Sequence, residues 1–318
     1  MSLSKDDLRQ SVYELQCDSL PPPYRGKVRD VFELPSEKLA ILTTDRVSAF
    51  DYILPQTIPY KGQILNRLAV HAFENVSNII PSHLIALPHP NVMIVRKCRI
   101  LPIEVIVRGY LAGSAWRKYR DGARTISGIR ISDGLKQNQQ LPEPILTPTT
   151  KADSGHDQDI TEAEILEQGI VSRQMWEQIK ESALRLFETG SRLSEEQGLL
   201  LVDTKYEFGL IDDQLILADE VHTPDSSRFF YSEGYQQRLQ ADQPQRQLSK
   251  EFIREWLMEQ GFSGEEGQTL PQLSDEFRIE AYNRYAELYR NMTGTEFESV
   301  STRDLSSRLP EILAPWLE

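Results

Sequence analysis

The chain has 318 residues, of which 39% are hydrophobic and 26% charged, a composition typical of a globular protein with about two domains. Its formal charge of −13 argues against nucleic acid as a partner, because phosphate contacts need lysine and arginine, although a small anion could still occupy a local basic pocket. Cys17 and Cys98 belong to no zinc-like or disulfide-like pattern, and no apolar run approaches the ~18 residues of a membrane span. We therefore expect a cytoplasmic protein with no membrane partner.

The first hundred residues are dominated by strand signals. Residues 1–19 predict a leader with a short helix, and "GKVRDVFEL" and "KLAILTT", separated by "PSE", predict a hairpin. The apolar spacing in 64–76 is typical of a short helix. Two further strands are expected at 92–98 and 103–109, joined by a turn around Ile100–Pro102.

The middle of the chain predicts a long loop and then helices. Residues 120–160 are rich in glycine, proline and polar side chains, so we expect mostly loop, which at this length is usually functional or disordered. One helix is expected to start at Thr161. A longer helix should run from Ser172, as its N-cap, to about Arg192.

Two amphipathic helices are expected near the C-terminus. The first is capped by Ser249 and stopped by Gly261, and the second is capped by Ser274 with Gly294 beyond its end. Strands first and helices last indicate an α+β fold. We expect an N-terminal, mainly antiparallel β lobe, an α+β lobe with the site, and a C-terminal helical segment, at 1–99, 100–245 and 246–318.

Neither of two familiar nucleotide motifs, GxxxxGK[ST] and GxGxxG, is present, so a nucleotide would bind another way. The stretch "YRGKVRD" is one candidate. Gly26 allows close approach of a ligand, and Lys27 and Arg29 would lie on one face of a strand, where both could meet phosphate oxygens. The alternative is a solvated basic edge strand that discourages pairing with another chain.

The stretch "TTDRVSAFDYILP" places Asp45, Arg46, Ser48 and Asp51 at the end of a strand, where sites often lie. Without other information, the favoured interpretation is a turn in which Asp45 and Ser48 hydrogen-bond to their own backbone.

The stretch "EVIVRGYLAGSAWRKY" carries Arg108 at the end of an apolar strand, then Gly109 and Gly113, and Ser114 at the start of a short helix. A helix N-terminus with serine, glycine and arginine suits a phosphate. The alternative is an ordinary strand–turn–helix junction with Ser114 as N-cap. Arg108 weighs against that alternative, because a bulky cation at a buried strand end needs a partner.

The polar stretch "PTTKADSGHDQDI" contains Lys151, His156, Asp157 and Asp159. A lone histidine is weak evidence of a site and the spacing is not that of a zinc site. The stretch could act as a lid that brings Lys151 over a bound nucleotide.

Charges interrupt the strand-like stretch "LLLVDTKYEFGLIDDQLILADE". Asp203, Lys205 and Glu207 are two residues apart and therefore share one face of a strand. The return strand ends in Asp219 and Glu220. These charges could form weak cross-strand salt bridges, worth roughly 0.2–1 kcal/mol each.

The length of the hairpin loop decides which side chains oppose each other. A two-residue loop at Asp212-Asp213 would place Tyr206 opposite Asp219, whereas a longer loop or a bulge would place Glu207 opposite Asp219. Two opposed carboxylates repel unless a cation lies between them, and Mg²⁺ suits such a pair when phosphate oxygens complete its shell. Glu207 and Asp219 are therefore the predicted Mg²⁺ ligands, and Lys205 would reach a phosphate.

Together these stretches resemble the SAICAR synthetase family. The resemblance covers about residues 20–260 and depends on five blocks in the family's order: "GKVRDVFEL", "TTDRVSAFD", "VRGYLAGSAW", "LPEPILTPTTKAD…HD" and "LVDTKYEFGL…LADEVHTPDSSRF". It implies a two-lobed fold related to ATP-grasp enzymes, with antiparallel sheets, C-terminal helices and ATP between the lobes. It also implies a ligase of de novo purine synthesis that condenses carboxyaminoimidazole ribonucleotide (CAIR) with L-aspartate through an acyl phosphate.

The resemblance further implies roles for particular residues. Those expected at ATP are Gly26, Lys27, Val28, Arg29, Lys205 and, as the adenine hinge, Ile100 and Leu101. Those expected at the ribonucleotide or other substrate atoms are Ser48, Asp51, Arg108, Gly109, Ser114 and Arg228. Lys205, Asp225 and Arg228 are the expected catalytic residues, and Glu207 and Asp219 the Mg²⁺ ligands.

Two other classes of function remain open at this point. A small-molecule kinase of the inositol-phosphate type could also use a D-x-K strand and a carboxylate for Mg·ATP, although the "RGYLAGSAW" and "TPTTKAD" blocks argue against it. A non-enzymatic nucleotide-binding scaffold would not need an intact metal pair. The sequence does not determine the oligomeric state.

Overall fold

The computed structural model describes residues 3, 6–17, 20–151 and 158–317. The chain forms two compact units. Unit 1 comprises Met1–His71, His83–Lys97 and Ser249–Glu318, and unit 2 comprises Ala72–Ser82 and Cys98–Leu248. The division of the chain into 1–99, 100–245 and 246–318 stays a prediction.

Unit 1 is built on an antiparallel sheet in the order β1-β2-β3-β7-β6. Its strands are β1 (Tyr24–Arg25), β2 (Arg29–Leu34), β3 (Lys38–Thr43), β6 (Leu84–His89) and β7 (Val92–Arg96). The predicted hairpin is confirmed, because Leu34 pairs with Lys38 across the loop, in which Ser36 and Glu37 have positive φ. A second, short hairpin joins β4 (Ser48–Ala49) to β5 (Tyr52–Ile53).

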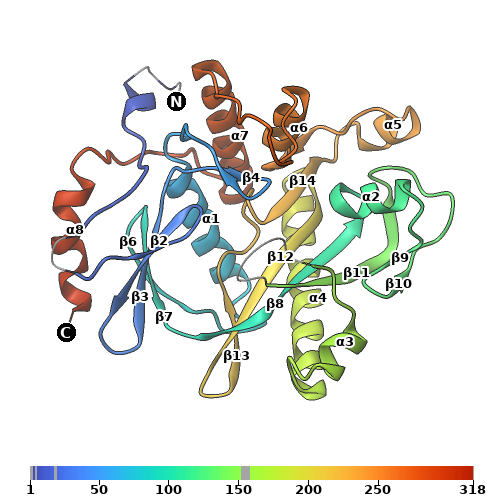
Figure 1. The fold of residues 1–318 in the computed structure, drawn as a ribbon, viewed down its shortest axis with the longest axis horizontal. Coiled ribbons are helices and arrows are strands. Elements are labelled where there is room, and N and C mark those ends of the chain that lie inside the picture. The colour runs from blue at the N-terminus through green and yellow to red at the C-terminus, as the bar shows by residue number, and fades with distance from the viewer. Residues whose placement is uncertain (1–2, 4–5, 18–19, 152–157, 318) are drawn as a thin grey trace. The chain divides into compact units, whose positions relative to one another are not determined.

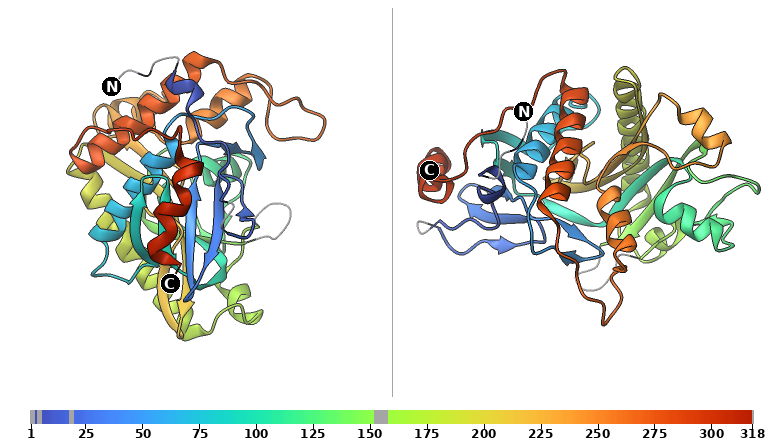
Figure 2. Two further views of the ribbon diagram at one scale, coloured as in Figure 1. Left: turned by 90° about the vertical axis from the view of Figure 1, so that its left-hand side faces the viewer. Right: turned by 90° about the horizontal axis from the view of Figure 1, so that it is seen from above.

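A C-terminal helix covers part of this sheet. Leu305, Leu309 and Leu313 of α8 (Leu305–Leu313) pack in one core with β2, β3 and β7, and Figure 2 shows this red helix beside the blue strands. The other helices with residues in unit 1 are η1 (Asp7–Arg9), α1 (Lys61–Asn75), whose last turn belongs to unit 2, α6 (Glu251–Glu259), α7 (Asp275–Thr293) and η2 (Ala314–Trp316).

The expected C-terminal helices form, with one difference in capping. Ser274 accepts a hydrogen bond from the Phe277 amide and Gly294 ends α7 at φ +72°, as predicted. In α6 the N-cap is Lys250 rather than Ser249. The Ser249 hydroxyl still accepts a bond from the Glu251 amide, so it satisfies a first-turn donor from one position further out.

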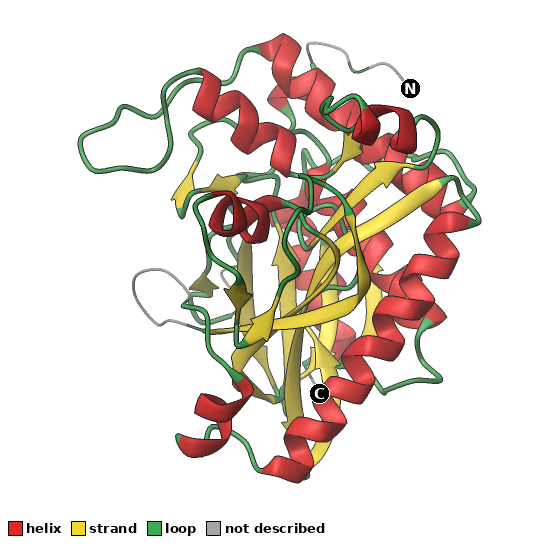
Figure 3. Ribbon diagram, turned by 90° about the vertical axis from the view of Figure 1, so that its right-hand side faces the viewer, coloured by secondary structure: helices red, strands yellow, loops and turns green. Residues whose placement is uncertain are grey.

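Unit 2 contains a second sheet in the order β11-β8-β12-β14-β15, with β13 pairing with β12. Its strands are β8 (Arg99–Tyr110), β11 (Gln140–Thr150), β12 (Leu199–Ile211), β13 (Gln214–Ala218), β14 (Ser227–Tyr231) and β15 (Gln247–Leu248). The long helix α4 (Arg173–Glu195) packs against β12, β8 and β13, as Figures 1 and 3 show. Smaller elements are α2 (Gly113–Arg120), β9 (Thr125–Ile126), β10 (Ile129–Arg130), α3 (Glu162–Glu167) and α5 (Tyr235–Gln240).

One sequence-based expectation about unit 2 is incomplete and another is wrong. Turns and loops make up more than half of the described residues of 120–160, as expected, but β11 occupies eleven residues of the stretch and pairs with β8. An edge strand tolerates prolines, which lack an amide donor, so Pro142, Pro144 and Pro148 do not prevent pairing. The expected turn at Ile100–Pro102 is wrong, since β8 starts at Arg99.

The caps expected at the start of α3 and α4 are present. Thr161 forms a reciprocal capping box with Glu164, and Ser172 accepts a bond from the Met175 amide. Across the described part of the chain, no helix has both the length and the apolar character needed to cross a bilayer.

Candidate active site

One face of the unit 2 sheet carries charged side chains on neighbouring strands. Residues directly paired across strands point to the same face, and the register pairs Asp203 with both Arg108 and Arg228, and Glu207 with Glu104. Thr147 of β11 pairs with Ile106 and therefore belongs to this face too. We call this set the polar face: Glu104, Arg108, Thr147, Asp203, Lys205, Glu207 and Arg228. The prediction that Asp203, Lys205 and Glu207 share one face is confirmed.

The opposite face of the same strands packs on α4. A Cβ added at Gly109 would lie 3.0 Å from the Phe187 ring, so glycine is needed there for close packing of this helix. The buried Tyr206 hydroxyl lies 2.8 Å from His222 Nε2, and burial lowers the pKa of His222 to about 4. The alternation along β12 thus separates a charged face from a packed one. A substrate contact through Gly109 stays a prediction.

Two arginines on the polar face share one carboxylate. Arg108 Nη1 and Arg228 Nη1 each lie 3.2 Å from Asp203 Oδ2, and all three side chains are largely buried. Arg108 also donates to the Thr147 hydroxyl at 2.8 Å and to Ser114 Oγ at 3.3 Å. Burial lowers the pKa of Arg108 and the nearby Arg228 lowers it further, while Asp203 opposes the shift. Two guanidinium groups against one carboxylate leave a local excess of positive charge suited to a phosphate.

The start of helix α2 lies beside these arginines. Its N-cap is Ala112, so the alternative in which Ser114 is an ordinary N-cap is wrong. Ser114 lies inside the first turn, is exposed, and accepts a bond from Arg108. A Cβ at Gly113, whose φ is +56°, would lie 2.5 Å from Arg228 Nη2. The missing side chain at Gly113 therefore allows the Arg228 guanidinium to lie against the helix.

Gly113→Ala is expected to displace Arg228 and to weaken the binding of a phosphate anion at these arginines about tenfold or more, because one charge-assisted contact is misplaced. Titration calorimetry with inorganic phosphate would measure this. The matched control is Gly122→Ala, which introduces alanine at another positive φ, +102°, with no atom within 4 Å. Equal dissociation constants in the two variants would show that backbone strain, not Arg228, explains any change.

A chain of alternating charges occupies the other end of the polar face. Lys205 Nζ lies 2.7 Å from Glu104 Oε1 and 2.7 Å from Glu207 Oε1, while Lys151 pairs with Glu207 Oε2. Burial opposes charging of Lys205, but Glu207 and Glu104 outweigh it and raise its pKa. Burial would also raise the pKa of Glu207, yet Lys205 and Lys151 hold it below the usual range. The network therefore stays charged.

The loop of the β12–β13 hairpin has two residues. Ile211 pairs with Gln214, and Asp212 and Asp213 both have positive φ, which is the geometry of a type I′ turn. Glu207 consequently pairs with Ala218, so the alternative that placed Glu207 directly opposite Asp219 is wrong. Asp219 follows the last paired residue and has φ +59°, so regular strand alternation does not extend to it.

These carboxylates have the chemistry that Mg²⁺ prefers. Glu207 is buried and held ionised, and Asp219 is the residue next to its cross-strand partner. Across the described ranges, no group of three or more His, Cys, Asp and Glu side chains could hold a metal. Mg²⁺ commonly binds through one or two carboxylates completed by phosphate oxygens and water, so the pair fits the ion only together with a nucleotide.

The loop after Asp219 returns to the polar face. It connects β13 to β14 and contains Asp225, which is partly exposed. The Ser227 amide bonds to the Thr223 carbonyl at 2.8 Å, and the Lys205 amide bonds to the Ser226 carbonyl at 2.9 Å. The backbone around Asp225 is thereby tied to the strand that carries Lys205.

In unit 1, the side chain of Arg46 hydrogen-bonds to the backbone of the turn between β1 and β2. This buried side chain donates to the carbonyls of Gly26 and Lys27, at 3.1 and 3.0 Å, and to Asp30 at 2.8 Å. Val28 accepts a bond from the Thr44 amide at 3.0 Å. Arg46 thus has a structural role in shaping this turn.

Lys27 lies in this turn rather than on a strand with Arg29, because β2 begins at Arg29; the predicted alternation is wrong. Lys27 instead pairs with Asp51 at the tip of the β4–β5 hairpin. Ser48 of the same hairpin lies 3.5 Å from Lys250 Nζ. Unit 1 therefore places Lys27, Ser48, Asp51 and Lys250 in one group.

The remaining predicted residues are not members of these two groups, although Asp159 lies near enough to Arg108 to oppose the lowering of its pKa. Ile100 and Leu101 lie in β8, where Ile100 is 38% exposed and Leu101 is buried, so an adenine contact there stays a prediction. Asp159 pairs with Lys118. His156 and Asp157 lie outside the described residues, as does the rest of 152–157 in the middle of the predicted lid.

Several members of these groups were not predicted as site residues from the sequence: Glu104, Thr147, Asp203 and Lys250. Glu104 and Arg108 occur in "IEVIVR", where polar residues interrupt an apolar strand four positions apart, as in "VDTKYE". Period-two alternation across both stretches could have indicated Glu104. Lys250 has no such signal, because its contact with Ser48 joins residues 202 positions apart.

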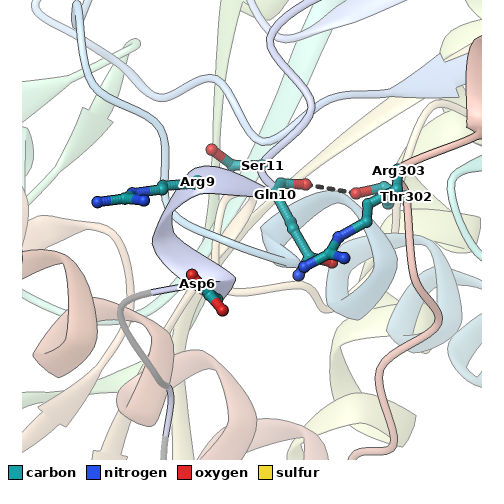
Figure 4. A pocket seen from close by; sticks show the side chains of 6 residues that line it. All are labelled: Asp6, Arg9, Gln10, Ser11, Thr302 and Arg303. Atoms are coloured by element: carbon teal, nitrogen blue, oxygen red, sulfur yellow. Dashed lines mark hydrogen bonds between the residues drawn. The ribbon is translucent and has the colours of Figure 1, made fainter.

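A cavity of about 390 Å³ also occurs in unit 1, and Figure 4 shows its lining residues. They are Asp6, Arg9, Gln10, Ser11, Thr302 and Arg303. Thr302 donates to the Gln10 carbonyl across it. The lining contains none of the predicted site residues.

Comparison with known proteins identifies the family. The family model described as SAICAR synthetase matches residues 22–269. A phosphoribosylaminoimidazole-succinocarboxamide synthase from Bacteroides thetaiotaomicron is 49% identical over 287 residues, which cover 90% of this chain and 91% of that protein.

Solved structures give the same result. The SAICAR synthase from Saccharomyces cerevisiae in complex with SAICAR has a TM-score of 0.78 at 33% identity and covers 91% of this chain and all of its own. A SAICAR synthetase in complex with ADP has a TM-score of 0.68 at 26% identity, covering 87% of this chain and 100% of that one. The predicted α+β fold is confirmed by this similarity.

Proposed function

The chain belongs to the SAICAR synthetase family, and from this premise we propose that it joins the carboxylate of CAIR to the amine of L-aspartate. The reaction consumes ATP and yields SAICAR, ADP and phosphate, a step of purine biosynthesis. The observation that carries the proposal is the polar face. Its arginines, Arg108 and Arg228, could bind an anion, and the same strands carry the ionised network of Lys205 and Glu207.

The chemistry sets simple demands on the protein. A carboxylate resists attack by an amine in water, so ATP first transfers its γ-phosphoryl group to a CAIR carboxylate oxygen and ADP leaves. The aspartate amine then attacks the acyl phosphate carbon and phosphate departs. Phosphoryl transfer needs alignment and counter-charge more than covalent help from the protein. The protein must therefore supply cationic side chains at fixed positions around the phosphoryl group.

We assign the 5′-phosphate of the ribonucleotide to Arg108, Arg228 and Ser114. The support is that both guanidinium groups converge on Asp203 and leave donors unused by that carboxylate. Ser48, Asp51 and Gly109 are proposed as further substrate contacts. Asp225 is proposed to act at the reacting groups, because its loop is bonded to the Lys205 strand.

We assign the nucleotide phosphates to Lys205 in unit 2 and to Gly26, Lys27, Val28 and Arg29 in unit 1. Ile100 and Leu101 are proposed to contact adenine. ATP as substrate is supported by the related structure that holds ADP. Glu207 and Asp219 would hold Mg²⁺, which supplies charge neutralisation at the phosphates when bound. Two cysteines not joined in a disulfide support the further proposal of a cytoplasmic location.

A coupled ADP-release assay tests the function. With Mg·ATP, CAIR and L-aspartate together, we expect ADP and SAICAR in equal amounts, and little ADP when aspartate is omitted. Sustained ADP release without aspartate would indicate a kinase instead. No ADP release with all three substrates would indicate a binding scaffold and would contradict the proposal.

A further inference from the structure

Glu104 is a buried carboxylate on the polar face that the proposed reaction does not use. It is 8% exposed and lies directly opposite Glu207, which is 5% exposed, on the neighbouring strand. Like charges directly opposite each other on adjacent strands are destabilising, and buried charges need partners. This pair is compatible with the fold because Lys205 lies between the two carboxylates, 2.7 Å from each.

The two partners of Lys205 are not equivalent. Glu207 is also paired with Lys151 and is the proposed Mg²⁺ ligand, so both of its oxygens are already engaged. A divalent cation on Glu207 would neutralise that carboxylate and repel the nearby ammonium group. Glu104 has no proposed metal role, and it is the acceptor that Lys205 retains.

We propose that Glu104 is a positioning residue, which holds the Lys205 ammonium group at the nucleotide phosphates when Mg²⁺ occupies Glu207. The inference depends on the proposed function, since it takes Lys205 as the phosphate-binding group. Glu104 itself does not contact the substrate. It affects nucleotide binding only through the position of Lys205.

The experiment is a double-mutant cycle on nucleotide affinity, read by titration calorimetry with ADP in the presence and absence of Mg²⁺. Glu104→Gln keeps the shape of the side chain but removes its charge. We expect it to weaken Mg·ADP binding about tenfold, and metal-free ADP binding much less, because Glu207 still anchors Lys205 when no metal is bound. In a Lys205→Met background the same change should have little further effect. Glu104→Asp should restore part of the affinity.

The controls separate this role from a general structural one. Glu162→Gln also breaks a glutamate–lysine pair of unit 2, with Lys180 at 3.0 Å, and should leave ADP affinity unchanged. Equal losses with and without Mg²⁺, or an undiminished loss in the Lys205→Met background, would overturn the proposal. ADP binding needs neither CAIR nor aspartate, so coupling between Glu104 and Lys205 can be detected even if the ligase assay gives no product. Failure of this proposal is therefore distinguishable from failure of the proposed function.

Discussion

Replacing Lys205 with methionine is expected to lower turnover at saturating Mg·ATP by about 10²- to 10³-fold, the usual cost of removing one positioned charge from a phosphoryl-transfer site. Lys205 is the cation to which both buried carboxylates of the network point. Product formation should be measured with all three substrates saturating. Rates like those of the wild type would refute the assignment of Lys205 to the reaction.

Loss of this cation also affects the fold, and the control must address that. Removing one partner of a buried ion pair typically costs about 3–5 kcal/mol, because the other charge is left uncompensated. Lys205→Arg keeps the charge and both pairings, so it should retain near wild-type thermal stability. If the arginine variant is folded but as inactive as the methionine variant, the point charge and length of lysine are required. If it is fully active, any cation suffices.

Arg108→Ala is expected to raise the KM for the ribonucleotide by about 10- to 150-fold, the cost of one or two hydrogen bonds to a charged group, with a smaller change in kcat. The variant should fold, because Asp203 keeps its second partner, Arg228, at 3.2 Å. Initial rates with CAIR varied and ATP and aspartate saturating would measure the separate effects on KM and kcat. An unchanged KM would remove Arg108 from the phosphate site.

Two further variants refine this test. Arg108→Lys retains a charge but not the forked guanidinium group that contacts Asp203, Thr147 and Ser114, so we expect a KM between those of the wild type and Arg108→Ala. Arg120→Ala removes an exposed arginine paired with Asp121 on α2 and should not change KM. A similar rise in KM for Arg120→Ala would indicate that general positive charge, not the Arg108 geometry, attracts the ribonucleotide.

Local pattern alone predicted much of this protein. The spacing of Asp203, Lys205 and Glu207 placed them on one face, and the caps of α3, α4 and α7 are where serine and threonine predicted them. These features depend on residues within a few positions of each other, where steric and hydrogen-bonding preferences act directly. The five quoted blocks were likewise enough for the family.

Pairing between distant segments was not predictable in the same way. Three prolines made β11 look like loop, but it pairs along its length with β8 on one side, and on the other side the structure describes only a single bridge, between Thr149 and Asp159. Local propensity cannot report whether a strand lies at an edge, and that position decides whether proline is tolerated. The N-cap of α2 and the position of Lys27 also differ from the prediction. In both cases the first residue of the element is not determined by local residue preferences alone.

The sequence by itself determined which residue types occupy each strand face, because side chains alternate along a strand whatever its partner. Only the tertiary structure decided that Glu104, about a hundred residues earlier, lies opposite Glu207, and that Arg108 and Arg228 share Asp203. Register between distant strands is set by packing of both sheet faces, here against α4 on one side, and not by any local preference. The charge balance of the site is therefore a property of the assembled sheet.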